Sequence, residues 1–307
     1  MKTLLLIDGN ALVHRAYHAL PNFRTSKGIP TNALYGFASM LHKVVKDFSP
    51  SHVFVCFDAP GKTFRDKLFK EYRSHRPEAD KDLVSQFPLI KDFLSCAHIP
   101  FEEQSGLEAD DLIAVMAKQA KKKDLHTIIL TGDKDIFQLI DSKTYVLTPQ
   151  LGATNGKLYN ESEVKKRFGI SPHQIPDHKA LAGDPSDNYK GVPGIGPKTA
   201  TSLINTYGSI EDIYKKINKV VPESVKKKLI EGKNQALLAK KLAVLAQNER
   251  LQTKIADTKS TGYNKALEEF FDKYEFKSLK KRYFNNKTGL KPKKPHKDTT
   301  QNQLGLF

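Results

Sequence analysis

Residues Thr3–Asp8 read TLLLID, and they decide the fold because they form an unbroken apolar run that stops at an acid. Two later stretches repeat this pattern: His52–Asp58 reads HVFVCFD, and His126–Asp133 reads HTIILTGD. None of the three alternates between apolar and polar residues, which is typical of strands covered on both faces. Each run therefore predicts a buried strand with an aspartate at or just beyond its carboxyl end.

Helical patterns separate these strands. They lie at Asn32–Phe48, Asp82–Ala97 and Ala109–Lys123, and a further short strand is expected at Tyr145–Thr148. Strands and helices in alternation predict the α/β class, with a mostly parallel central sheet flanked by helices. We assign residues 1–186 to this α/β domain.

The chain changes character near Asp184. Gly191–Ala200 reads GVPGIGPKTA, and Lys-rich amphipathic patterns follow it to about Phe284, so we expect a helical subdomain over residues 187–284. From residue 285 onward the sequence holds few large apolar residues and several lysines and prolines. Such a segment cannot offset its ordering entropy by burial, which predicts a flexible tail over residues 285–307.

Composition points to a polyanionic partner. The 307 residues include 50 Lys and Arg against 34 Asp and Glu, a net charge of +16, which favours nucleic acid. Two cysteines cannot form a disulfide framework. No stretch approaches the about 18 apolar residues of a membrane span, so we expect a cytoplasmic protein that does not enter a membrane.

Acids mark a candidate site. Asp8, Asp58 and Asp133 end three predicted strands, and the carboxyl ends of parallel strands meet at one rim. A cap of a helix or turn explains any one of them alone, but explains three together poorly. The motifs GLEADD, TGDKD and GDPSDN complete the acidic set with Glu108, Asp110, Asp111, Asp135, Asp184 and Asp187. Hard divalent ions take oxygen ligands, and a pair of ions about 4 Å apart needs several carboxylates, so a two-metal site is predicted.

Basic residues surround this candidate site in the sequence. Residues 62–76 read KTFRDKLFKEYRSHR, with aromatic residues between the basic ones, which favours capture of a single strand over a merely solvated basic helix. The six basic residues are Lys62, Arg65, Lys67, Lys70, Arg73 and Arg76. In GVPGIGPKTA the glycines allow backbone amides to approach a phosphate at a helix start, so Gly191, Gly194, Gly196 and Lys198 are candidate contacts to duplex DNA; a plain tight turn is the alternative.

As an ordered set, these motifs resemble the 5′ nuclease family, which includes the bacterial 5′-3′ exonuclease domain of DNA polymerase I and the flap endonucleases. The resemblance rests on LLLIDGN, VFVCFD, GLEADD, TGDKD and LAGDPSDNYKGVPGIGPKTA, and it extends from about residue 1 to about residue 284. It implies a PIN-like 5′ nuclease fold with a helical gateway at about 60–82 and a helix-hairpin-helix at about 188–206.

The resemblance also implies residue roles. One metal ion would be held by Asp8, Asp58, Glu108 and Asp110, and a second by Asp111, Asp133, Asp135, Asp184 and Asp187. Alternatively, Asp110 and Asp111 would bridge the two ions. Arg15, Tyr72 and Arg76 match positions near the scissile nucleotide or its phosphate. The cofactors would be two Mg²⁺ or Mn²⁺, with K⁺ at the hairpin.

The implied activity is structure-selective hydrolysis of DNA phosphodiesters, as a 5′-3′ exonuclease and flap endonuclease. Its substrates would carry 5′ flaps, nicks or RNA primers in replication and repair. Two other classes stay open: a DNA-binding scaffold without catalysis, against which the complete set of acids argues, and an RNA-processing nuclease, against which the duplex-binding hairpin argues.

The end of the chain suggests a further partner. With about 300 residues we expect a stand-alone nuclease that works as a monomer. Its last five residues, QLGLF, resemble the bacterial sliding-clamp-binding pentapeptide, although Gly305 departs from the usual Ser or Asp, and an accidental apolar terminus is the alternative. The candidate clamp contacts are Gln303, Leu304, Leu306 and Phe307.

Overall fold

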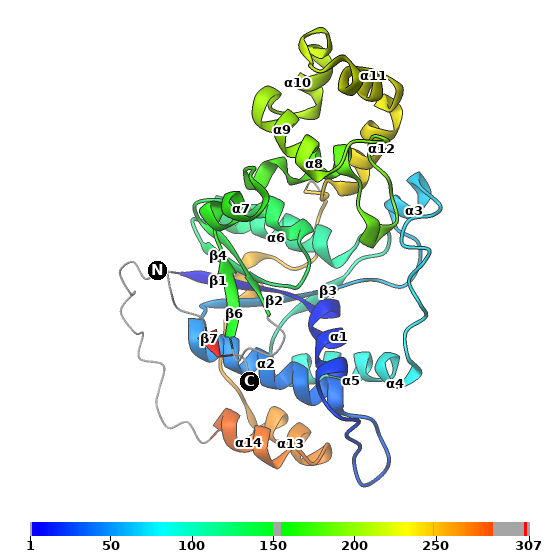
Figure 1. Cartoon of the computed structure of the whole chain (residues 1–307). Coiled ribbons are helices and arrows are strands. Elements are labelled where there is room, and N and C mark those ends of the chain that lie inside the picture. Colours follow the sequence, from blue (N-terminus) through cyan, green and yellow to red (C-terminus); the bar gives the residue numbers. More distant parts are fainter. Residues whose placement is uncertain (1, 150–154, 248, 285–303, 306–307) are drawn as a thin grey trace.

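A central sheet organises the molecule (Figure 1). The computed structural model describes all residues except 1, 150–154, 248, 285–303 and 306–307. The strands follow the order β3-β2-β1-β4-β5-β6-β7; pairing is parallel from β3 to β5 and antiparallel for β6 and β7. Their bounds are β1 Thr3–Asp8, β2 His52–Phe57, β3 Phe101–Glu103, β4 His126–Leu130, β5 Thr144–Thr148, β6 Asn155–Tyr159 and β7 Leu304–Gly305. The expected mostly parallel α/β sheet is confirmed.

Helices cover the sheet and extend the molecule at one end. Those of the sheet domain are α1 Gly9–Ala19, α2 Asn32–Phe48, α3 Phe64–Leu68, α4 Lys81–Val84, α5 Gln86–Cys96, α6 Ala109–Lys122 and α7 Glu161–Phe168. The later ones are α8 Ile175–Ala182, α9 Pro197–Tyr207, α10 Ile210–Lys215, α11 Glu223–Glu231, α12 Lys233–Ala243, α13 Lys265–Lys273 and α14 Lys277–Phe284. Among the described residues, no helix combines the length and apolar character that a membrane span needs.

The central strands contribute side chains to two hydrophobic cores, one on each face of the sheet. Leu4 and Leu6 of β1 belong to the core that also includes α6, whereas Leu5 and Ile7 belong to the core beneath α1, α2 and α5. All four side chains are fully buried. Because successive side chains of a strand point to opposite faces, a strand covered on both faces must be apolar at every position. The unbroken apolar runs of the sequence therefore have the expected cause.

The segment between β2 and α5 differs from the predicted helical gateway. It holds only the short helix α3, then turns through residues 69–76, and then α4. Arg73 adopts a positive φ of 52°, which an α-helix cannot accommodate. The helix expected over Asp82–Ala97 is likewise divided at Ser85 into α4 and α5.

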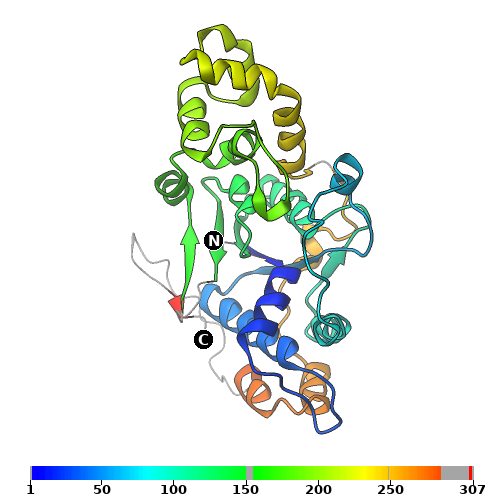
Figure 2. The ribbon, with the colours of Figure 1, turned by 45° about the vertical axis from the view of Figure 1, so that its right-hand side comes forward.

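The helical part of the chain also divides differently from the prediction. Helices α8 to α12 form one end of the molecule, where the Asp177 carboxylate accepts hydrogen bonds from Ile210 N and Lys240 Nζ, both at 2.8 Å. Helices α13 and α14 instead return to the sheet domain and pack in the core of α2 and α5 (Figure 2). The expected subdomain of residues 187–284 stays a prediction, and the apolar faces of its last two helices are buried on the sheet side.

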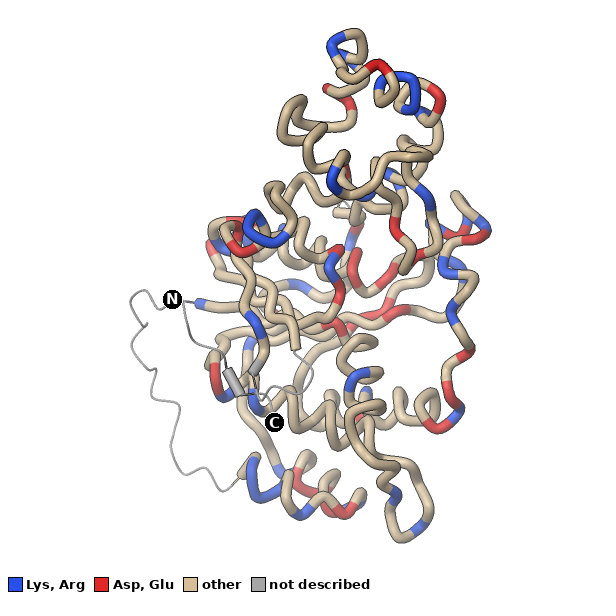
Figure 3. Tube along the Cα trace, in the orientation of Figure 1, with Lys and Arg blue, Asp and Glu red and all other residues tan. Residues whose placement is uncertain are grey.

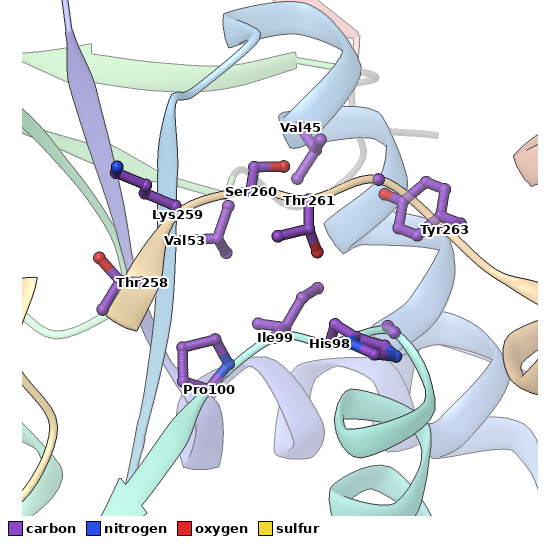
Figure 4. Close-up of a pocket in the computed structure, with 12 residues that line it drawn as sticks. Val45, Val53, His98, Ile99, Pro100, Thr258, Lys259, Ser260, Thr261 and Tyr263 are labelled. Carbon is purple, nitrogen blue, oxygen red and sulfur yellow. The ribbon is translucent and has the colours of Figure 1, made fainter. Parts of the chain in front are cut away.

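The connection to α13 lies along the sheet domain. Figure 4 shows Thr261 and Tyr263 of this connection beside Val45, Val53 and Ile99. The cavity between them has a volume of about 10 Å³, which is room for about one water molecule. The connection therefore closes over the sheet domain and leaves no ligand-sized space there.

Gly191 makes a close backbone approach that predicts a large effect of one methyl group. A Cβ at this position would lie 2.3 Å from Leu181 O and 2.4 Å from Gly183 N. We expect Gly191→Ala to lower the free energy of unfolding by about 1–3 kcal/mol, as overpacking does. Gly196→Ala is the control, since a Cβ there would meet nothing within 4 Å. Urea unfolding of both variants tests this, and equal losses would contradict it.

Candidate metal centre

Acids from three adjacent strands meet in one cleft. Asp8 ends β1, Asp58 follows β2, and Asp133 follows β4, and these strands are neighbours in the parallel part of the sheet. The cleft has a volume of about 480 Å³, and Glu108 and Asp110 from the start of α6 complete its acidic lining. Figure 3 shows acidic positions gathered in the middle of the molecule, between the sheet and the helical end. The predicted convergence at one rim is present.

Backbone and side-chain donors fix two of these carboxylates. Asp8 caps α1, with Oδ1 accepting from Ala11 N at 2.9 Å and Oδ2 accepting from Thr131 Oγ1 at 2.7 Å. Asp58 Oδ1 accepts from Ala109 N at 2.7 Å, which joins the end of β2 to the start of α6. Capping and convergence therefore act together, because the same acids hold the helix starts around the cleft.

Burial and mutual repulsion make the cleft a strong site for cations. Burial, opposed by the hydrogen bonds from Ala11 and Thr131, raises the pKa of Asp8 to about 7, and the charges of Asp58 and Asp133 add to the rise. Burial and the charge of Asp133 raise the pKa of Asp110 well above its ordinary value. A divalent cation would relieve both the desolvation and the repulsion of these carboxylates. The donor set is all oxygen, as Mg²⁺ and Mn²⁺ prefer.

A second acidic group adjoins the first. Asp135, Asp184 and Asp187 are all buried and each offers a carboxylate oxygen, with these atoms all within 4.8 Å of one another. Asp135 and Asp184 line a cavity of about 360 Å³ that shares Asp133 with the first cleft. The acids thus form two neighbouring groups with Asp133 between them, close to the division that the resemblance implied.

Lysine and arginine side chains lie among these acids. Lys179 of α8 forms ion pairs with both Asp135 and Asp184. Burial works to raise the pKa of Asp184, but Lys179 and Ser186 lower it overall. Lys179 was missed by the sequence analysis, although its place one helical turn before GDPSDN could have drawn attention to it.

The segment after α3 closes over the acids from the other side. Arg73 Nη1 lies 3.0 Å from Glu108 Oε2, and Arg73 Nε lies 2.7 Å from Asp187 Oδ1. Arg76 Nη2 lies 2.8 Å from the same Asp187 oxygen. The single proton of the Tyr72 hydroxyl can be donated to Asp187 Oδ2 at 3.0 Å or to Glu108 Oε2 at 3.3 Å. Tyr72 was predicted near the scissile nucleotide; here its side chain is buried and bridges the two acidic groups.

Two predicted site residues have a different place. Arg65 was expected to contact DNA and Asp111 to hold a metal, but both side chains are buried and form an ion pair at 2.8 Å. Asp111 is fully inaccessible, and both of its oxygens accept hydrogen bonds from Arg65. In this structure neither side chain is available for the role that the sequence analysis gave it, because each satisfies the other.

The remaining predicted contacts divide by exposure. Lys62, Lys67 and Lys70 are exposed, in and next to α3, and do not line the cleft. Arg15 and Thr131 both line a small neighbouring cavity. In the glycine turn, Gly194, Gly196 and Lys198 are exposed, but Gly191 is buried against α8 and cannot reach a phosphate.

Two residues that line the cleft had no role in the sequence analysis. They are Asn10 and His14 of α1, a helix that the sequence analysis did not predict. Of the predicted clamp motif, Gln303, Leu306 and Phe307 lie outside the described residues, as does most of the predicted flexible tail.

Comparison with known proteins decides the family. Residues 3–169 match the 5′-3′ exonuclease N-terminal resolvase-like domain, and residues 170–266 match the 5′-3′ exonuclease C-terminal SAM fold. The chain belongs to the 5′-3′ exonuclease family. The two family domains meet at residues 169 and 170, whereas the boundary at residue 186 stays a prediction.

Relatives of this family resemble the chain over most of its length. The 5′-3′ exonuclease of Aquifex aeolicus is 39% identical over 284 residues, which are 92% of this chain and 95% of that protein. DNA polymerase I of Bacillus subtilis is 40% identical over 264 residues, which are 86% of this chain and 30% of that protein. The chain spans about a third of the length of the DNA polymerase I proteins that it matches.

A solved structure shares the fold. The flap endonuclease of bacteriophage T5, solved with DNA and metal ions, has a TM-score of 0.66 at 21% identity, with 91% of this chain and 100% of that chain covered. At this level of identity the likeness concerns the fold alone.

The raised pKa of Asp8 predicts a pH dependence of stability in chelator. Its ordinary value is 3.8 and its folded value is about 7, so between these pH values the folded state holds a proton that the unfolded state has lost. Stability must therefore fall as pH rises from about 4 to 7. We expect the melting temperature in EDTA to fall over this range for the wild type and less for Asp8→Asn. Parallel curves for the two proteins in calorimetry would contradict the assignment.

Proposed function

We propose that this chain is a structure-selective 5′ nuclease that hydrolyses DNA phosphodiesters with two divalent metal ions. It would act as a 5′-3′ exonuclease and as a flap endonuclease. The observation that carries the proposal is the convergence of all the predicted acids except Asp111 into two adjoining groups that share Asp133. Membership in the 5′-3′ exonuclease family supports the reaction and its direction.

The residues divide the work as follows. Asp8, Asp58, Glu108 and Asp110 would hold one ion, and Asp133, Asp135, Asp184 and Asp187 would hold the other. When bound, the ions supply the Lewis acidity that activates a water molecule and stabilises charge on the phosphate oxygens. Arg73 and Arg76 stand at the acids with guanidinium groups suited to a phosphate, and we propose that they orient the scissile phosphodiester.

DNA binding would use the basic surface around the cleft. Lys62, Lys67 and Lys70 are exposed in and next to α3, and the exposed Gly194, Gly196 and Lys198 at the start of α9 suit a duplex backbone. Substrates would carry 5′ flaps, nicks or RNA primers, met during replication and repair. The T5 relative of the same fold was solved with DNA and metal ions.

The cofactors and setting are part of the proposal. Mg²⁺ or Mn²⁺ suits the carboxylate donors, and we propose in addition that K⁺ binds at the glycine turn. The curated relatives are bacterial DNA polymerase I and 5′-3′ exonuclease, so we place the work of this chain in the bacterial cytoplasm, as a monomer.

A cleavage assay with a buried-acid variant tests the function. We expect the wild type to release the 5′ arm of a labelled flap duplex in Mg²⁺ and to release none in EDTA. Asp110→Asn should lose at least about 100-fold in rate, because a carboxylate ligand at the ions is lost. Asp124→Asn is the matched control, since the Asp124 side chain is 84% exposed and pairs with Lys143, away from the acids of the cleft.

The same assay separates the alternatives. A scaffold without catalysis would bind the flap duplex and cleave nothing in Mg²⁺. An RNA-processing nuclease would prefer a single-stranded RNA of the same length. Equal cleavage rates for Asp110→Asn and the wild type would reject Asp110 as a ligand of a catalytic metal ion.

A second partner is proposed from the end of the chain. Residues 303–307 suit the apolar pocket of a bacterial sliding clamp, which would tether the nuclease to DNA. The two of them that the structure describes, Leu304 and Gly305, form β7 beside β6. Clamp binding would therefore compete with this pairing.

Removing this segment gives a direct test. We expect deletion of residues 303–307 to abolish binding to an immobilised clamp in surface plasmon resonance, while cleavage of a short flap substrate stays at the wild-type rate. The control replaces Gln301, just before the motif, with alanine. Unchanged clamp affinity after the deletion would reject the motif.

A further inference from the structure

An arginine and an aspartate form a buried pair behind the metal centre. Arg65 of α3 is 1% exposed, and Asp111 of α6 is fully buried. The guanidinium donates to both carboxylate oxygens, with Nη1 to Oδ2 at 2.8 Å and Nη2 to Oδ1 at 2.9 Å. This two-pronged geometry is specific to arginine, because a lysine presents a single ammonium group.

The pair uses its remaining hydrogen-bonding capacity on the chain that follows α12. Arg65 Nε donates to Leu242 O at 2.9 Å, and Nη2 donates to Val244 O at 3.2 Å. Asp111 Oδ1 also accepts from Ala246 N at 2.8 Å. Both charged groups therefore bind residues 242–246, where the chain leaves the helical end of the molecule.

The pair also holds the start of α6, which carries two of the metal-centre acids. Asp111 Oδ2 accepts from Glu108 N at 3.1 Å, the reciprocal half of a capping box. The side chains of Glu108 and Asp110, which belong to this first turn, line the cleft. Arg65 Nη1 lies 3.5 Å from Glu108 Oε2 as well, so the pair restrains both the backbone and the side chain of this ligand.

Three segments thus meet at one ion pair. The segment between β2 and α5, called the gateway here, reaches the pair through α3. The metal centre reaches it through the start of α6, and the helical end reaches it through residues 242–246. Asp111 has no exposed oxygen, and each of its oxygens accepts two hydrogen bonds. A metal ion could reach it only by displacing Arg65. The burial of two charges is tolerated because nearly every donor and acceptor is satisfied.

We propose that Asp111 holds no metal ion and that the Arg65–Asp111 pair is a positioning device, which docks the gateway and the helical end onto the start of α6 and so sets Glu108 and Asp110 at the metal centre. This inference rests on the proposed function, because it assumes that the acids of the cleft bind two metal ions. Metal-binding measurements, which need no activity, can show which residues bind the ions and which residues only position the ligands.

Metal binding by single variants separates a ligand from a positioning residue. Mn²⁺ is titrated calorimetrically into the full chain, for the wild type, Asp111→Asn and Arg65→Lys. We expect both variants to bind as many ions as the wild type, with an affinity weakened about 10–100-fold, as seen when a residue that orients a ligand is changed. Loss of one ion in Asp111→Asn, with the full number retained in Arg65→Lys, would overturn the proposal.

An exposed pair of the same chemistry is the control. Arg24 and Asp82 form an ion pair with side chains 46% and 36% exposed. Arg24→Lys and Asp82→Asn should leave Mn²⁺ number and affinity at the wild-type values. Equal weakening by these variants and by those of the buried pair would show a general effect of charge, and would also overturn the proposal.

A double variant keeps the test decisive if a single variant fails to fold. Arg65→Met combined with Asp111→Leu removes both charges and leaves no unpaired ion in the interior. We expect it to fold, to bind the full number of Mn²⁺ ions, and to bind them weakly, because the segments are no longer docked in register. Wild-type affinity in the double variant would reject a positioning role, and loss of an ion would return Asp111 to the ligands.

Cleavage kinetics distinguish this proposal from the proposed function. If the wild type cleaves flap DNA, Arg65→Lys should recover cleavage as Mg²⁺ is raised, since its site is weakened and complete. If the wild type binds Mn²⁺ and cleaves nothing, the nuclease proposal fails while the calorimetric comparison still decides the role of the pair.

Discussion

Repulsion among buried carboxylates is the constraint on which the rest of this structure depends. Asp8, Asp110 and Asp133 all have raised pKa values, and in each case burial is the largest cause and neighbouring acids contribute. A chain gains nothing in stability from gathering like charges out of water. The surrounding fold must therefore hold the acids together against their own electrostatics, and the two cores of the sheet supply the free energy to do so.

The architecture resolves this constraint by placing the acids where the backbone can bind them. Parallel strands end at the same edge, and helices start there, so main-chain N–H groups face the carboxylates. Asp8 and Asp58 each accept such a hydrogen bond. Basic side chains complete the compensation: Lys179 lies between Asp135 and Asp184, and Arg73 lies between Glu108 and Asp187. These basic side chains neutralise only part of the acidic charge, and they come from the same segments that would bind a polyanion.

The sequence predicted those features that depend on local pattern. The apolar runs that end at Asp8 and Asp58 were enough to place a parallel sheet and its acidic edge, since both strands are buried on two faces. Pairing between distant charged residues was not predictable in this way. Arg65 and Asp111 each stand in a motif rich in residues of their own charge, and nothing in either motif shows that one neutralises the other. The docking of α13 and α14 on the sheet side was missed for the same reason, because an amphipathic helix shows that it packs and not where.

The path of the chain joins the helical end of the molecule to the sheet domain at two points. Helices α8 to α12 leave the sheet domain after α7, and the chain then comes back along the sheet to α13 (Figure 1). This end is consequently an insertion with two covalent tethers to one body. Leu181, Leu203 and Ala236 of this end belong to the same hydrophobic core as Ile113 of α6, so packing joins it to the sheet domain as well as the two tethers. A nucleic acid lying across both parts would therefore meet residues that packing and ion pairs already hold in place.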